Sequence, residues 1–185
     1  ISKAFGTDVG VEVSSKGVQV YGGMGVIEET GAAQYSRDVR VTTIYEGTNG
    51  IQAMDLVARK MMDGGEAAYR LIEEIEATSE AAKAKHPDLA EAVWQAAESL
   101  RETTEWLVTQ DMTDRFAGAV PYLRAFARVL GGHIHLTAAI KGDDSRLRLA
   151  TFYINRMLPE FAGLLAHVRE GADDLMAITA DDLAA

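Results

Sequence analysis

Apolar residues along this chain recur three and four positions apart over long stretches, whereas the strict alternation that is typical of strands is scarce. This spacing places apolar side chains on one face of a helix. Two of the clearest stripes are Leu89, Val93, Ala96, Leu100 and Leu107, and then Phe116, Val120, Leu123, Phe126, Leu130 and Ile134. The pattern therefore predicts an all-α protein.

Glycines and capping residues predict where the first helices begin and end. We expect helices over residues 4–20 and 30–43, with Gly22-Gly23 ending the first and a loop over 24–29. A third helix should start at Thr48 or Asn49 and run to residue 62. Residues 39–45 are rich in β-branched side chains, but a lone strand among helices would have no partner, so we favour the helix.

The Asp63-Gly64-Gly65 run is the clearest break in the chain, and we predict a domain boundary there, between residues 1–62 and 63–185. The second part contains long amphipathic segments joined by short connections, which is typical of an antiparallel up-down helical bundle. These segments cover residues 66–85, 89–110, 116–141 and 146–169. Pro121 and Pro159 should kink or restart their helices, and the tail should hold one short helix and a frayed end.

Composition narrows the possible partners. The net charge of −10 lies almost entirely in residues 63–185 and argues against a nucleic-acid partner. No apolar run approaches the roughly 20 residues of a membrane span. The absence of cysteine excludes disulfides and thiolate metal ligands, and the four scattered histidines predict no metal site. The chain starts without methionine, within an apparent helix, so we expect it to be part of a longer protein.

Three motifs occur in order within the first 62 residues. They are the run Gln19-Val20-Tyr21-Gly22-Gly23-Met24-Gly25, the run Arg37-Asp38-Val39-Arg40, and the run from Ile44 to Gln52, which reads Ile-Tyr-Glu-Gly-Thr-Asn-Gly-Ile-Gln. Together they resemble the C-terminal all-α domain of the flavin-dependent acyl-CoA dehydrogenases. Residues 63–185 resemble, less specifically, the C-terminal extension of a longer subfamily that includes enzymes acting on 3-methylmercaptopropionyl-CoA.

The resemblance implies a catalytic role for Glu46, as the base that removes the α-proton of an acyl-CoA thioester. Such a base needs an apolar, water-excluded site that brings its pKa towards neutrality. Tyr45 and Gly47 are implied as substrate contacts, and the backbone N–H of Glu46 as a donor to the thioester oxygen. The alternative is that Glu46 is a solvated carboxylate ahead of a helix N-terminus.

The resemblance also implies two segments that contact FAD. In the first, Gln19, Gly22 and Gly23 would reach the flavin of a neighbouring subunit. The second, Thr48-Asn49-Gly50, lies at a helix N-terminus, a favourable place for an anion. Gly50 departs from the larger polar residue of many relatives, which leaves a backbone contact there. Arg37 and Asp38 are adjacent, so we interpret them as structural residues with partners elsewhere.

These observations predict the C-terminal part of a homo-oligomeric FAD enzyme, a dimer or dimer of dimers, that oxidises an acyl-CoA to its trans-2-enoyl-CoA. An electron-transfer flavoprotein is the expected acceptor, with an oxygen-using acyl-CoA oxidase as the alternative. The isolated chain should be inactive, and it could act alone only as a helical interaction module. The expected location is the bacterial cytoplasm, or the mitochondrial matrix in a eukaryote.

Overall fold

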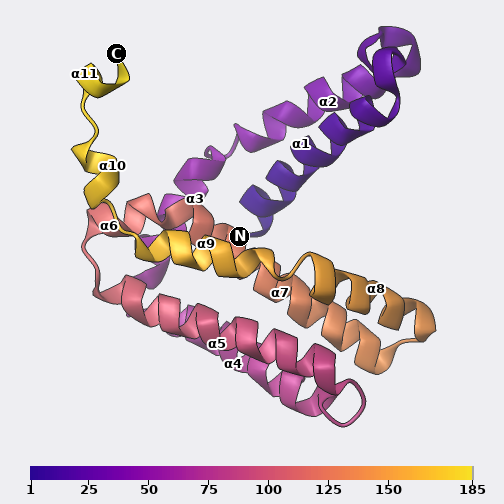
Figure 1. Ribbon diagram of the computed structural model, residues 1–185, viewed down its shortest axis with the longest axis vertical. Helices are drawn as coiled ribbons and strands as arrows, with labels where there is room; N and C mark the ends of the chain where they lie inside the picture. Colours follow the sequence, from indigo (N-terminus) through magenta and orange to yellow (C-terminus); the bar gives the residue numbers. More distant parts are fainter. Residues whose placement is uncertain (185) are drawn as a thin grey trace. The chain divides into compact units, whose positions relative to one another are not determined.

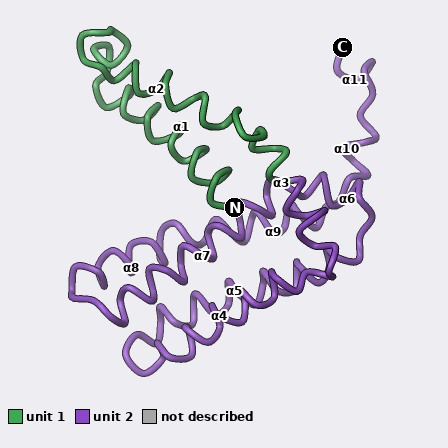
Figure 2. The backbone as a smooth tube through the Cα atoms, turned by 180° about the vertical axis from the view of Figure 1, so that it is seen from behind, with its two compact units in different colours: residues 1–53 green, residues 54–185 purple. Residues whose placement is uncertain are grey.

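The computed structural model describes residues 1–184, which form helices, 3₁₀ turns and connecting segments without a strand. This confirms the all-α prediction. The chain divides into two compact units, residues 1–53 and 54–185, which Figure 2 distinguishes by colour.

The first unit is a pair of helices that pack along each other. Helix α1 (Ser2–Val20) and helix α2 (Ala32–Arg40) lie side by side, and α3 (Asn49–Val57) begins near the end of the unit (Figure 1). The predicted loop over 24–29 instead forms 3₁₀ turns, at Gly22–Val26 and Glu28–Thr30. Gly22 and Gly31 take left-handed backbone conformations, with φ of 61° and 74°, which glycine adopts without steric cost.

Residues 39–45 confirm the preference for helix over strand. Helix α2 runs to Arg40, and a 3₁₀ turn over Val41–Thr43 continues it. Few side chains of the first unit are buried: Ala4 and Ala53 are the two buried apolar side chains, whereas Val20 and Tyr35 are largely exposed. Such a small core gives little hydrophobic stabilisation to offset the entropy lost on folding.

The second unit is an antiparallel helical bundle. Helices α4 (Glu66–Ala82) and α5 (Pro87–Thr109) pack against each other and against α7 (Ala119–Lys141). The fourth position is filled by α8 (Asp144–Arg156) followed by α9 (Glu160–Arg169), both of which contact α7 (Figure 1). The remaining helices are short: α6 (Met112–Ala117), α10 (Asp173–Ala177) and α11 (Ala180–Leu183).

Two of the four predicted bundle segments are interrupted, and glycine and proline explain where. Gly118 separates α6 from α7, and Pro121 lies in the first turn of α7, where a missing N–H costs no hydrogen bond. Pro159 is the N-cap residue of α9 and lies directly before its first turn. The side chains of Asp111 and Asp143 accept hydrogen bonds from backbone N–H groups and cap α6 and α8. Both prolines therefore restart helices, as predicted.

The bundle core follows the predicted stripe of α5 and only part of the stripe predicted around α7. All five predicted residues of α5 are buried, whereas the stripe around α7 places Phe116, Val120 and Ile134 on exposed positions. Leu123 and Phe126 of the predicted stripe are buried, and the inward face of α7 also includes Ala119, Tyr122, Val129 and Leu136. Apolar residues occur on more than one side of α7, so helical spacing alone could not identify the whole inward face.

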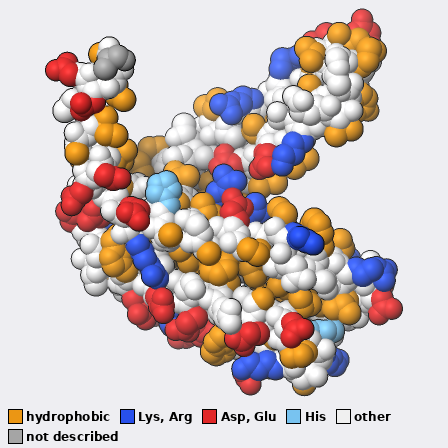
Figure 3. Space-filling view, viewed as in Figure 1, with side chains coloured by type: hydrophobic (Ala, Val, Ile, Leu, Met, Phe, Trp, Pro, Cys, Tyr) orange, Lys and Arg blue, Asp and Glu red, His pale blue; other side chains and the backbone are white. Residues whose placement is uncertain are grey.

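Several polar side chains inside the bundle have hydrogen-bond partners, whereas His133 Nδ1 and Thr137 Oγ1 of α7 are buried without one. Within the core, Thr104 and Tyr122 share a hydrogen bond of 2.7 Å, and burial raises the pKa of the Tyr122 hydroxyl. Arg101 of α5 makes two hydrogen bonds to Glu76 of α4, at 2.9 and 2.7 Å, which join these helices near the surface. Asp and Glu side chains cover the outer side of the α4–α5 pair and the C-terminal helices (Figure 3).

The extent of the second unit predicts how the chain can be shortened. Val57 and Met61 precede the predicted boundary at Gly64, yet both are buried and belong to the second unit. A chain that starts at Met54 should therefore melt cooperatively when followed by circular dichroism. A chain that starts at Gly65 should melt at a lower temperature, because it lacks these two side chains. Equal melting temperatures would contradict the assignment of Val57 and Met61 to the second unit.

The domain boundary between residues 62 and 63 stays a prediction.

Candidate functional site

Glu46 has the most unusual backbone of the first unit. Its φ is 55°, and it is the one non-glycine residue with a positive φ in the part of the chain that the structure describes. A side chain in the left-handed region costs about 1–2 kcal/mol. Gly47 follows with a φ of 85°, so two successive residues are left-handed. Such strained conformations persist when surrounding contacts enforce them, and they concentrate at functional sites.

Two side chains hold the backbone around Glu46. The Gln52 amide nitrogen donates a hydrogen bond of 2.8 Å to the Glu46 carbonyl oxygen. The Lys3 ammonium group donates one of 2.8 Å to the next carbonyl oxygen, that of Gly47. The two donors come from different helices, α3 and α1. The loop is thus fixed at consecutive carbonyls, while the Glu46 side chain itself remains exposed.

Gly47 also packs closely against the end of the Gln52 side chain. A Cβ atom added at this position would lie 2.9 Å from the Gln52 amide nitrogen, which is closer than real Cβ contacts allow. A side chain at residue 47 would therefore displace the same amide that binds the Glu46 carbonyl. Tyr45 is about half exposed and lies directly before Glu46.

Asn49 ties the start of α3 to the first turns of α1. Its side-chain oxygen accepts a hydrogen bond of 2.7 Å from Lys3, and its amide nitrogen donates to Asp8 at 2.6 Å and to the Thr7 hydroxyl at 2.9 Å. The same nitrogen lies 3.1 Å from the Ala4 carbonyl oxygen. The Asn49 side chain is thus occupied within this chain, so its predicted contact with FAD would be made by the backbone.

Thr48 and Gly50 occupy the helix N-terminus that the sequence predicts. The Thr48 carbonyl accepts the first helical hydrogen bond of α3, at 3.0 Å from the Gln52 backbone nitrogen, which places Thr48 at the N-cap position. A Cβ atom added at Gly50 would meet no atom within 4 Å. A phosphate group could therefore approach the first backbone N–H groups of α3 closely.

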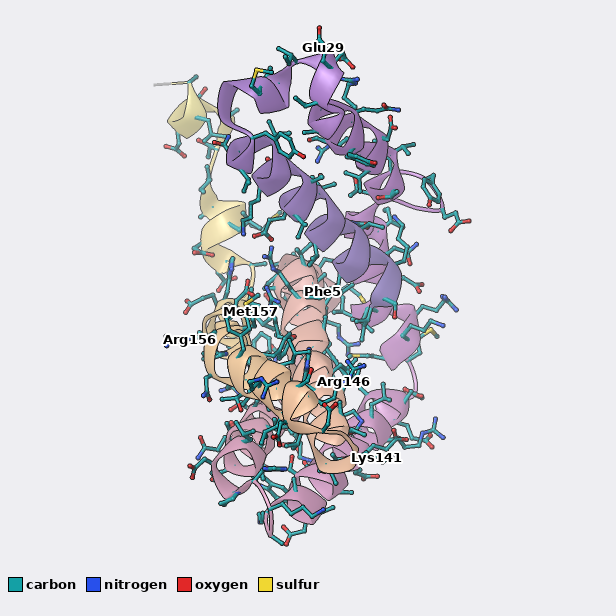
Figure 4. The ribbon with its side chains drawn as sticks, turned by 90° about the vertical axis from the view of Figure 1, so that its right-hand side faces the viewer. Phe5, Glu29, Lys141, Arg146, Arg156 and Met157 are labelled. Carbon is teal, nitrogen blue, oxygen red and sulfur yellow. The ribbon has the colours of Figure 1, made fainter. Side chains whose placement is uncertain are left out.

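Gln19, Gly22 and Gly23 lie at the opposite end of α1. Gln19 is exposed, and a Cβ atom at either glycine would meet nothing within 4 Å, so this backbone is also accessible to a ligand. Thr7, which contacts Asn49, and Gln19 are separated along α1 by about 18 Å. Figure 4 labels Phe5 near the start of α1 and Glu29 in the turn beyond its end.

Both predicted FAD segments have features that fit a dinucleotide: open glycine backbone, an amide side chain and a helix N-terminus. Because they lie at opposite ends of α1, they cannot contact the same phosphate group. This separation is compatible with a cofactor shared between subunits. The individual contacts stay predictions.

Arg37, for which we predict a structural role, has an ion-pair partner elsewhere in the chain. Arg37 forms an ion pair of 2.8 Å with Glu28, nine residues away, rather than with its neighbour Asp38. The hydrogen bond from Arg37 lowers the pKa of the Glu28 carboxyl group. Both side chains are exposed, so the pair contributes little to stability. It links the turn after α1 to helix α2.

Sequence reasoning missed Lys3 and the role of Gln52. Gln52 is the last residue of the most distinctive motif. Its position six residues after Glu46 does not predict that its side chain binds the Glu46 carbonyl oxygen. Lys3 is 44 residues from Gly47, and a contact between such distant residues depends on how the helices pack. Within residues 1–184, no helix is long and apolar enough to cross a membrane, and no three His, Asp or Glu side chains cluster as metal ligands.

The motifs agree with comparisons to known proteins. Residues 1–62 match the family model described as "Acyl-CoA dehydrogenase, C-terminal domain", and residues 71–179 match "Acetyl-CoA dehydrogenase C-terminal like". The chain therefore belongs to the acyl-CoA dehydrogenase family. The two matches follow each other along the chain, and the second covers most of the helical bundle.

Individual relatives support the same assignment. The chain is 36% identical to the 3-methylmercaptopropionyl-CoA dehydrogenase of Ruegeria pomeroyi over 94% of its length, which is 33% of that protein. It is 27% identical to the butyryl-CoA dehydrogenase of Syntrophomonas wolfei over 88% of its length and 30% of the relative. The short-chain specific acyl-CoA dehydrogenase of Megasphaera elsdenii is 44% identical over 29% of this chain and 14% of its own length. The chain thus spans about a third of the length of the first two relatives.

Proposed function

We propose that the full-length protein is an FAD-dependent acyl-CoA dehydrogenase, in which Glu46 removes the α-proton of an acyl-CoA thioester. The product would be the trans-2-enoyl-CoA. The observation that carries this proposal is the left-handed backbone of Glu46, held at two successive carbonyls within a motif of the family. A solvated carboxylate with no further role would not need to be held in a costly conformation.

Each candidate residue of this chain has a specific role in the proposed reaction. The Glu46 carboxylate accepts the proton, and its backbone N–H donates to the thioester oxygen, where negative charge develops. Gly47 lets the substrate approach the backbone, and Tyr45 contacts the acyl group. Thr48, Asn49 and Gly50 would hold one FAD, and Gln19, Gly22 and Gly23 that of a neighbouring subunit. The flavin, when bound, supplies the acceptor for the hydride from the β-carbon.

We propose a homo-oligomer, in which Gln19, Gly22 and Gly23 contact the FAD of a neighbouring subunit. An electron-transfer flavoprotein is the proposed electron acceptor of the reduced enzyme. The substrate class is an acyl-CoA, by analogy with the relatives named above.

The test is anaerobic titration of the full-length protein with acyl-CoA thioesters of different chain length, including 3-methylmercaptopropionyl-CoA. We expect bleaching of the flavin absorbance near 450 nm by at least one of them, with formation of the enoyl-CoA. Slow reoxidation when air is admitted would support a dehydrogenase, and rapid reoxidation would indicate an oxidase. A flavin that no acyl-CoA reduces, or a protein that binds no flavin, would contradict the proposal.

A further inference from the structure

One residue supplies two groups to the proposed reaction, the Glu46 carboxylate and the Glu46 backbone N–H. The torsion between the N–H bond and the Cα–Cβ bond follows φ directly, because the peptide is planar and the Cα is tetrahedral. The φ of Glu46 therefore sets the direction of the base relative to the N–H donor. At 55° this angle differs from that of an ordinary helical or extended residue.

We infer that Gln52 is a positioning residue, which holds Glu46 in its left-handed conformation and so aligns the base with the N–H donor. This inference rests on the proposed function. The Gln52 amide nitrogen reaches the Glu46 carbonyl at 2.8 Å and also packs against Gly47, where an added Cβ would lie 2.9 Å from it. Its hydrogen bond thus acts on the residue whose φ must be kept.

Lys3 assists from the other side of the loop. Its ammonium group binds the Gly47 carbonyl at 2.8 Å and the Asn49 side-chain oxygen at 2.7 Å. Asn49 is in turn held by Thr7 and Asp8 of α1. Gln52 reaches the loop from within α3, and Lys3 anchors it to α1. The net stabilisation from one such hydrogen bond is comparable with the cost of a left-handed side chain, so its loss should release Glu46 to other conformations.

The test uses Gln52→Met in the full-length, FAD-containing protein, because methionine has a similar length but no N–H donor. We expect the rate of flavin reduction by acyl-CoA to fall about ten- to a hundredfold, the range that misplacement of a reacting group causes. The flavin content and the KM should stay within twofold of the parent. A substrate deuterated at its α-carbon should show a larger isotope effect, because proton removal becomes more rate-limiting.

Gln34→Met is the matched control, since Gln34 is an exposed residue of α2 outside the proposed site. It should leave the rate and the isotope effect unchanged. Gln52→Glu is a second variant with a side chain of the same shape. It places an oxygen, which cannot donate, near the Glu46 carbonyl oxygen, so the rate of flavin reduction should fall similarly. Either Gln52 variant reducing its flavin at the parental rate would overturn the inference.

Glu46→Gln separates this inference from the proposed function. If Glu46→Gln keeps the parental rate, Glu46 is not the base and both proposals fail. If Glu46→Gln loses the rate while the folded Gln52 variants keep it, only the positioning role of Gln52 is wrong.

Discussion

Glu46→Gln in the full-length protein is expected to lower the rate of flavin reduction by acyl-CoA about 10²- to 10⁴-fold, the contribution typical of a positioned general base. Glutamine is nearly isosteric with glutamate and can keep the backbone conformation, but its amide cannot accept the proton. Flavin content and ligand binding should therefore remain. The measurement is anaerobic stopped-flow absorbance of the flavin.

Glu29→Gln is the control for the change of charge. Glu29 is an exposed carboxylate of the same unit, located in the turn beyond α1 (Figure 4). It should leave flavin reduction unchanged. If the flavin of the Glu46→Gln variant is reduced at the parental rate, the base is another residue. Glu46 would then be a solvated carboxylate ahead of a helix N-terminus.

Gly131→Ala should destabilise the helical bundle by about 1–3 kcal/mol, the range of an overpacked core. A Cβ atom at residue 131 would lie 2.0 Å from the Tyr153 hydroxyl oxygen and 2.5 Å from the ring carbon that carries it. The rigid ring would have to move away. It would then lose its hydrogen bond to the Arg128 carbonyl, 3.2 Å long, and its stacking on His135.

Gly163→Ala is the matched control, because Gly163 also lies within a helix, α9, but a Cβ atom there would meet nothing within 4 Å. It should stabilise the bundle by about 0.5–1 kcal/mol, since alanine favours a helix more than glycine does. Urea denaturation followed by circular dichroism measures both variants. A Gly131→Ala protein as stable as the parent would mean that the bundle can accommodate the methyl group without cost.

Local signals in the sequence identified the helices and several of their ends. The first helix ends at residue 20, just before Gly22-Gly23, and α3 begins at Asn49, both as predicted, because a flexible glycine backbone and a capping side chain act on adjacent residues. The breaks around Pro121 and Pro159 follow the same local rule. The three motifs also revealed the family, since they depend on residue identity and order alone.

The inward face of α7 was identified only in part in this way. This helix carries apolar side chains on several sides, and which of them is buried depends on where α4, α5, α8 and α9 lie around it. Ile134 is exposed and Tyr122 is buried for this reason. Likewise, Met61 belongs to the second unit because of how it packs, although it precedes the glycine break at Gly64.

The sequence by itself determined the all-α fold and the candidate residues Glu46, Gly47 and Thr48, because local spacing and motif order carry that information. Only the tertiary structure decided the left-handed conformation of Glu46 and the contacts that hold it. Lys3 is distant in sequence from Gly47 and Asn49, and it reaches them because α1 places it beside the start of α3. A contact between distant residues depends on the arrangement of helices in space, and no local pattern records it.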